Sequence, residues 1–295
     1  MLKSILYGII VLIFFEINPS NYNNYNENSI SRFLNDTVTY NYELKIGEFR
    51  EKLTSDFIYE TYSCFLIITN LTKKEANKII YNTIANAEKC FYNDFFSTRP
   101  NEVISVFLFK DEETYKYWAE KLFEDTEVSY YGYYKPSEKV ILMNISTGGG
   151  TLVHELTHVY LRFNFPEIPV WLNEGLGSLY ERCTMSNYEI TGLVNWRLPS
   201  LQNSIINKTY KSLKYLFNVT EDEFYGENSG YYYAQARYFC YYLQELGLLK
   251  KFYKRFRSNY KEDSTGLLFI EEIFNKKIEL IDEDFTKWVM KLKYN

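Results

Sequence analysis

The chain has 295 residues, of which 46% are hydrophobic and 19% aromatic, and it carries a formal net charge of −5. This hydrophobic content is enough to bury one large core or two modest ones, which excludes a chain that is disordered throughout. The acidic balance, without any Lys/Arg-rich run, argues against nucleic acid as a partner.

The first residues are typical of an export signal. Lys3 precedes an apolar run over residues 5–15, which polar residues and Pro19 then interrupt. A run of this length matches the core of a signal peptide and is short for a membrane span. We therefore expect a signal peptide or N-terminal membrane anchor over residues 1–20 and an exported protein, whether periplasmic, extracellular or membrane-anchored. Residues 21–40 lack periodicity and predict a low-complexity tether.

The cysteines give no motif of their own. No two of them form a CxxC pair, so neither a thiol redox motif nor a cysteine-based zinc site is indicated. Their even number leaves both disulfides and buried free thiols open in an oxidising compartment. The four are Cys64, Cys90, Cys183 and Cys240.

Residues 41–147 alternate between strand and helix patterns. Runs of apolar and β-branched residues predict four strands, and two of them are followed by helix starts. Thr72 and Glu75 form a capping-box pattern, and Asp111 can cap a second helix. The predicted strands cover residues 62–69, 103–109, about 130–134 and 139–145. This order predicts an N-terminal mixed sheet with helices.

Residues 148–295 have a mainly helical pattern. A run of three glycines precedes the first helix, and Pro169 favours the start of the second. The clearest helices are predicted over residues 151–163, 170–182 and 231–246. The sequence therefore predicts an α+β fold in which a helical half follows the sheet half, with a cleft between them.

The residues 154–158 read His-Glu-Leu-Thr-His, an HExxH motif. On a helix, the four-residue offset places His154 and His158 on one face, one turn apart, where both imidazoles can bind one metal ion. Glu155 lies beside them, where it can act on a water molecule at the metal. A chance match is the alternative, but the chain contains only two histidines and both fall in this pattern.

The small number of histidines also constrains the third metal ligand. Catalytic zinc usually takes three protein ligands and a water molecule, so a carboxylate or another oxygen donor must complete the set. Glu174, sixteen residues after His158 and on the next predicted helix, is the natural candidate. Glu167 lies in the intervening turn. Glu181 follows along the same helix face as Glu174 and can orient a ligand from behind, or be a surface carboxylate.

The segment after the motif resembles a known family. Residues 171–181 read Trp-Leu-Asn-Glu-Gly-Leu-Gly-Ser-Leu-Tyr-Glu, and with the HExxH motif they resemble the peptidase MA-like group of gluzincin zinc metallopeptidases. The likeness extends over about residues 55–290. It implies a zincin-like fold, one Zn²⁺ per chain, and Glu174 as the third ligand. Asn173 and Glu181 are expected behind the ligands. Further segments that carry the likeness are 132–134, 148–150, 196–199 and 233–237.

One position departs from the family pattern. Gly177 stands where such proteins more often carry alanine. We expect this glycine to loosen the packing of its helix slightly without touching a ligand.

The motif predicts metal-assisted hydrolysis of peptide bonds. Glu155 is expected to take a proton from the attacking water and pass it to the leaving amine. A second donor must stabilise the developing oxyanion, and related gluzincins commonly use Tyr or His from a downstream helix. Because no further His is present, Tyr233 is the predicted donor, with Tyr232 as the alternative.

The resemblance also suggests how a substrate would bind. The strand over residues 139–145 is expected to be the edge strand, to which an extended peptide or protein substrate adds as a further strand. The glycines at 148–150 either allow close backbone approach at the cleft or form a turn that begins the helix.

Two other functions remain open at this stage. The protein could be a non-catalytic exported binding protein with a zincin fold, although an intact Glu155 argues against this because a structural metal site needs no base. It could also be a zinc hydrolase that acts on a non-peptide amide, such as an amidated glycan. The sequence assigns no oligomeric state.

Overall fold

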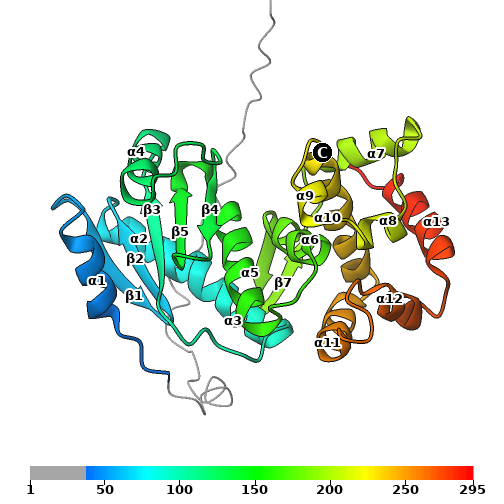
Figure 1. The fold of residues 1–295 in the computed structure, drawn as a ribbon, viewed down its shortest axis with the longest axis horizontal. Coiled ribbons are helices and arrows are strands. Elements are labelled where there is room, and N and C mark those ends of the chain that lie inside the picture. Colours follow the sequence, from blue (N-terminus) through cyan, green and yellow to red (C-terminus); the bar gives the residue numbers. More distant parts are fainter. Residues whose placement is uncertain (1–37, 295) are drawn as a thin grey trace, which may run out of the picture. The chain divides into compact units, whose positions relative to one another are not determined.

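A five-stranded mixed sheet forms the first half of the structure, a computed structural model that describes residues 38–294 (Figure 1). The predicted signal segment over residues 1–20, and residues 21–37 of the predicted tether, lie outside the described residues. The strand order is β1-β2-β3-β5-β4. Their bounds are Ile58–Tyr62 (β1), Phe65–Thr69 (β2), Ile104–Phe109 (β3), Gly132–Lys135 (β4) and Val140–Asn144 (β5).

The sheet contains both kinds of strand pairing. Strands β2, β3 and β5 are parallel, with Ile67 opposite Val106 and Val106 opposite Ile141. Strands β1 and β4 close the two sides as antiparallel partners of β2 and β5. The predicted strand over residues 62–69 is divided, because Ser63 takes a positive φ of 51° and turns the chain from β1 into β2.

The prediction that residues 139–145 form the edge strand is wrong. One side of β5 pairs with β3, and the other pairs with β4. The short connection after Lys135 folds the two strands into a hairpin, so β4 lies at the edge of the sheet.

The two faces of the sheet belong to two cores. Alternate side chains of a strand point to opposite faces, and here Phe107 and Leu142 pack under α1 (Tyr42–Arg50) and α4 (Glu112–Phe123). Val106 and Ile141, on the other face, belong to a larger core that continues into the C-terminal helices. This core crosses the predicted boundary between residues 147 and 148, and residues from Tyr40 onward group as one unit.

The helix predicted after residue 72 is present but interrupted. The predicted capping box is confirmed, since Thr72 and Glu75 bond each other's backbone N–H groups at the start of α2 (Lys73–Ile79). A π-helical segment (Ile80–Ile84) then separates α2 from α3 (Ala85–Asp94). Asp111 caps α4 as predicted, because its side chain accepts from the backbone of Thr114.

Two helices at the centre of the molecule carry the HExxH motif and the segment after it. These are α5 (Gly150–Asn164) and α6 (Val170–Tyr180), and α6 packs along α10 (Ser229–Glu245). Trp171 anchors α6, because its fully buried ring lies 4.6 Å from the Phe217 ring and its Nε1 donates to the carbonyl of Thr265.

The remaining elements surround α10 and include a hairpin that the sequence did not indicate. Strands β6 (Cys183–Ser186) and β7 (Glu189–Gly192) are joined by Asn187 and Tyr188, which both have positive φ as a type I′ turn requires. Among residues 38–294 no helix combines the length and apolar character that crossing a bilayer needs. The other helices are α7 (Leu198–Ile206), α8 (Leu213–Phe217), α9 (Glu221–Phe224), α11 (Leu249–Asn259), α12 (Leu267–Phe274) and α13 (Ile278–Val289).

Candidate metal centre

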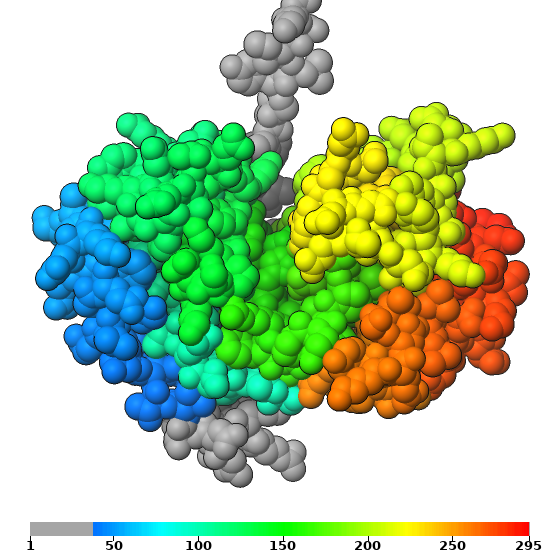
Figure 2. Space-filling model, in the orientation of Figure 1, coloured from blue at the N-terminus to red at the C-terminus, as the bar shows by residue number. Residues whose placement is uncertain are grey.

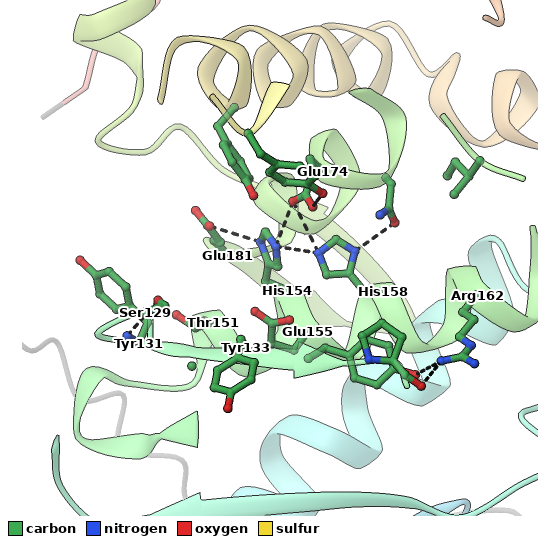
Figure 3. A pocket seen from close by; sticks show the side chains of 18 of the residues that line it. Ser129, Tyr131, Tyr133, Thr151, His154, Glu155, His158, Arg162, Glu174 and Glu181 are labelled. Atoms are coloured by element: carbon green, nitrogen blue, oxygen red, sulfur yellow. Dashed lines mark hydrogen bonds and ion pairs between the residues drawn. The ribbon is translucent and has the colours of Figure 1, made fainter. Parts of the chain in front are cut away.

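Helices α5 and α6 bring three predicted ligands together. The Nε2 atoms of His154 and His158 lie 2.8 Å apart, and Oε2 of Glu174 lies 3.4 Å from the first and 3.5 Å from the second (Figure 3). Tetrahedral bonds of about 2.1 Å would place neighbouring donor atoms about 3.4 Å apart. The buried His-His-Glu group can therefore hold a metal ion. Glu167 is not part of this group.

The outer nitrogens of both imidazoles face hydrogen-bond acceptors. Nδ1 of His158 lies 3.0 Å from Oδ1 of Asn173, and Nδ1 of His154 lies 3.2 Å from Oε1 of Glu181, which is an ion-pair contact without hydrogen-bond alignment. An acceptor at Nδ1 favours the proton there and leaves the lone pair on Nε2. Oε2 of Glu174 is buried and accepts no hydrogen bond from any of residues 38–294. Three electron-pair donors thus converge on one point, which is an arrangement suited to a cation.

The charges of the buried groups also favour a bound cation. Burial alone would lower the pKa of His154, but Glu174 and Glu181 raise it well above the ordinary value for histidine. Burial would raise the pKa of Glu174, and His158 and His154 hold it well below its usual range. Glu174 is therefore ionised, and the site attracts positive charge. Since protons and a metal ion compete for the same nitrogens, metal binding must release protons.

Glu155 lies beside this group without belonging to it. Burial raises the pKa of Glu155. The charges of His154 and His158 lower it, but the net pKa stays above the ordinary value for glutamate. The backbone of Tyr134 in strand β4 also helps to stabilise the ionised form of the Glu155 carboxyl group and so lowers its pKa slightly. A carboxyl group with a raised pKa, placed between the metal ligands and the edge strand, is suited to accept and release a proton.

Glu181 connects the metal centre to a second layer of charge. Its two carboxylate oxygens lie 3.0 Å from Nη2 and 3.4 Å from Nε of Arg197. The Arg197 guanidinium in turn lies 4.3 Å from the ring centre of Trp196 and 5.0 Å from that of Tyr233. Burial would raise the pKa of Glu181, but contacts with His154 and Arg197 lower it to about 2. Glu181 is therefore a fixed negative charge behind His154.

Two tyrosines flank Glu174 on the open side. Tyr233 lines the cleft, as the sequence predicted, and Tyr232 does not: its hydroxyl bonds to Lys211 and to Glu223, each at 2.6 Å. The alternative placement of the oxyanion donor at Tyr232 is therefore wrong. Tyr225, which the sequence analysis missed, donates from its hydroxyl to Oε1 of Glu174 at 2.6 Å. It follows the short helix α9, and no local pattern distinguishes it among 30 tyrosines.

The expectation that Gly177 touches no ligand is wrong. A Cβ atom at this position would lie 3.0 Å from Cε1 and Nε2 of His154. The glycine allows the imidazole to lie directly against the α6 backbone. A second glycine acts between the same helices, because a Cβ at Gly150 would lie 2.2 Å from the carbonyl oxygen of Glu181. Gly150, the last of the three glycines and the first residue of α5, therefore permits close packing within the protein.

An open cavity of about 990 Å³ gives access to the metal centre. Its floor is formed by α5 and α6, and the surface is hollowed between the green part of the chain and the yellow segment that includes α9 and α10 (Figure 2). One wall is the edge strand β4 with the loop before it, and the other includes Trp196, Tyr225 and Tyr233. All the predicted site residues line this cavity.

The sequence comparisons identify no relatives. No family model matches the chain, and no curated protein matches it.

Proposed function

We propose that this protein is a zinc metallopeptidase of the gluzincin type, with the zincin-like arrangement that the resemblance to the peptidase MA-like group implies. The observation that carries the proposal is the convergence of three buried donor atoms, from His154, His158 and Glu174, at the floor of an open cleft with Glu155 beside them. Two imidazoles and one carboxylate are a ligand set of catalytic zinc, which keeps a fourth position open.

The chemistry then divides between the metal and the chain. When bound, zinc supplies a Lewis acid and lowers the pKa of a water molecule at the open position. Glu155 removes a proton from the attacking water and delivers it to the leaving amine, a task that its raised pKa favours. Tyr233 donates a hydrogen bond from its hydroxyl group to the oxyanion that develops on the substrate carbonyl. Tyr225 holds Oε1 of Glu174, which keeps Oε2 directed at the histidines.

Strand β4 is the proposed docking edge for a peptide or protein substrate. The backbone N–H of Asn144 donates to the carbonyl of Tyr131, so residues 131, 133 and 135 face β5 by the alternation of an antiparallel ladder. Gly132 and Tyr134 therefore direct their backbone groups away from the sheet. An extended peptide can pair with these groups as an added strand, with its scissile bond near Glu155.

The proposed setting is outside the cytoplasm. It rests on the apolar run over residues 5–15, which has the length of a signal-peptide core, with N-terminal membrane anchoring as the alternative.

The decisive experiment compares the wild type with Glu155→Gln. Both proteins should hold about one zinc per chain by elemental analysis, and only the wild type should cleave a proteome-derived peptide library, with cleavage stopped by a chelator. Equal cleavage by the variant would show that Glu155 is not the general base. A metal-loaded wild type that cleaves no peptide would instead support a non-catalytic binding protein or hydrolysis of a non-peptide amide.

A further inference from the structure

A second functional group lies on the same face of α5 as the metal ligands. Arg162 follows His158 by four residues, so His154, His158 and Arg162 form one stripe along the helix. Arg162 lines the cleft, and the step from His158 is about one helical turn, or about 5.4 Å along the axis. Along an extended peptide this corresponds to about two residues.

Two arginines line this cleft, and only one of them is neutralised. Arg197 forms a two-point ion pair with Glu181. Arg162 forms no ion pair with any carboxylate of residues 38–294. A half-buried guanidinium without a counter-charge, beside a binding cleft, is a site for an anion supplied by a ligand.

The edge strand holds this guanidinium in place. Nη1 of Arg162 donates to the carbonyl of Pro136 and to the hydroxyl of Tyr134, the latter at 3.3 Å (Figure 3). These bonds use one nitrogen. The Nε–H and Nη2–H groups are the pair that binds a carboxylate through two parallel hydrogen bonds, and no hydrogen bond within residues 38–294 occupies them.

We propose that Arg162 binds a carboxylate of the substrate about two residues from the scissile bond and so selects acidic peptides. The carboxylate is either a Glu or Asp side chain or the C-terminal carboxylate. The inference rests on the proposed peptidase function, because it takes the cleft as a peptide site. It adds a determinant of specificity on the same helix as the metal ligands.

The test measures binding and turnover separately. Labelled peptides from a synthetic library are made in pairs that differ by Glu against Gln at one position, each with a free or an amidated C-terminus. Binding to zinc-loaded Glu155→Gln is compared with binding to Glu155→Gln/Arg162→Gln, and KM and kcat are measured in Arg162→Gln alone. Arg255→Gln is the control, because Arg255 is also a half-buried arginine, but it pairs with Glu272 and does not line the cleft.

The acidic member of one pair should bind about 10- to 100-fold more tightly than its neutral partner, and Arg162→Gln should abolish this preference. The KM of Arg162→Gln should rise by a larger factor for acidic peptides than for neutral peptides. Arg162→Lys should recover part of the preference. Tighter binding of the free than of the amidated C-terminus, with Glu or Gln at the varied position, would identify the C-terminal carboxylate. A preference for Glu over Gln that amidation leaves intact would identify a side chain.

Arg162 could instead serve only to attach β4 to α5. In that case Arg162→Gln would weaken the binding of acidic and neutral peptides equally, and this outcome overturns the proposal. Binding is measured in a protein that lacks the base, so a failure of the peptidase function leaves the Glu-against-Gln comparison unaffected. Tight binding of acidic peptides without cleavage would refute the enzyme and retain the carboxylate site.

Discussion

The floor and the tyrosine wall of the cleft differ in how their side chains are held and in how exposed they are. In the floor, formed by α5 and α6, His158 and His154 each face a fixed polar partner behind them, and Glu174 is buried between them. In the tyrosine wall, Tyr225 and Tyr233 reach the same point from segments around α9 and α10, and Tyr225 is 49% exposed. Under the proposed function, we therefore expect mutation of the floor to change metal binding and mutation of Tyr233 to change catalysis.

The largest expected effect is the loss of metal from Glu174→Ala. Removal of the single carboxylate donor leaves two imidazoles, so we expect less than about a tenth of the wild-type zinc to remain after dialysis. Elemental analysis measures the occupancy. Glu221→Ala is the matched control because it removes an exposed carboxylate from the same cleft. Full zinc occupancy in Glu174→Ala would show that metal binding does not require this carboxylate.

The two tyrosines of the wall should respond differently. Tyr233→Phe should lower kcat by about 100-fold, the typical cost of one oxyanion donor, with unchanged zinc content. Tyr225→Phe should instead weaken zinc binding by about tenfold, because its hydroxyl bonds to Glu174. Steady-state kinetics and chelator competition measure the two effects. If the two variants exchange these phenotypes, Tyr225 is the oxyanion donor.

Variants of the two residues that face the outer nitrogens of the histidines should weaken metal binding. Glu181→Ala removes the charge that faces His154 and leaves Arg197 without its partner. Loss of such a supporting group typically costs about 10- to 100-fold in metal affinity. Competition with a chromophoric chelator measures this affinity, and Asn173→Ala tests the equivalent support of His158. Wild-type affinity in both variants would mean that the ligands are oriented without these contacts.

The smallest effect concerns Gly177. Alanine would gain about 1 kcal/mol in helix propensity, yet its Cβ would meet the His154 ring at 3.0 Å. We therefore expect Gly177→Ala to bind zinc about threefold more weakly at an unchanged or slightly raised melting temperature, since packing strain falls on the ligand. Calorimetry and chelator competition separate the two quantities. Tighter zinc binding would show that the ring tolerates the methyl group.

The elements that could be predicted have local signals. The capping box at Thr72, the N-cap at Asp111 and the spacing of His154 and His158 each depend on residues within one or two helical turns. The short strands β6 and β7 have weak patterns, and β1 was missed because its residues are mostly half-buried. The π-helical interruption after α2 carries no distinct sequence pattern.

The sequence by itself determined which residues can bind a metal, because two histidines at a four-residue offset must share a helix face. It also restricted the third ligand to an oxygen donor, since no other histidine exists. Tertiary structure alone decided that β4 is an edge strand and that Tyr225 reaches Glu174. It also decided that Arg197 has a carboxylate partner while Arg162 has none among residues 38–294. These contacts join residues distant in the chain, and their geometry depends on how helices and sheet pack rather than on local periodicity.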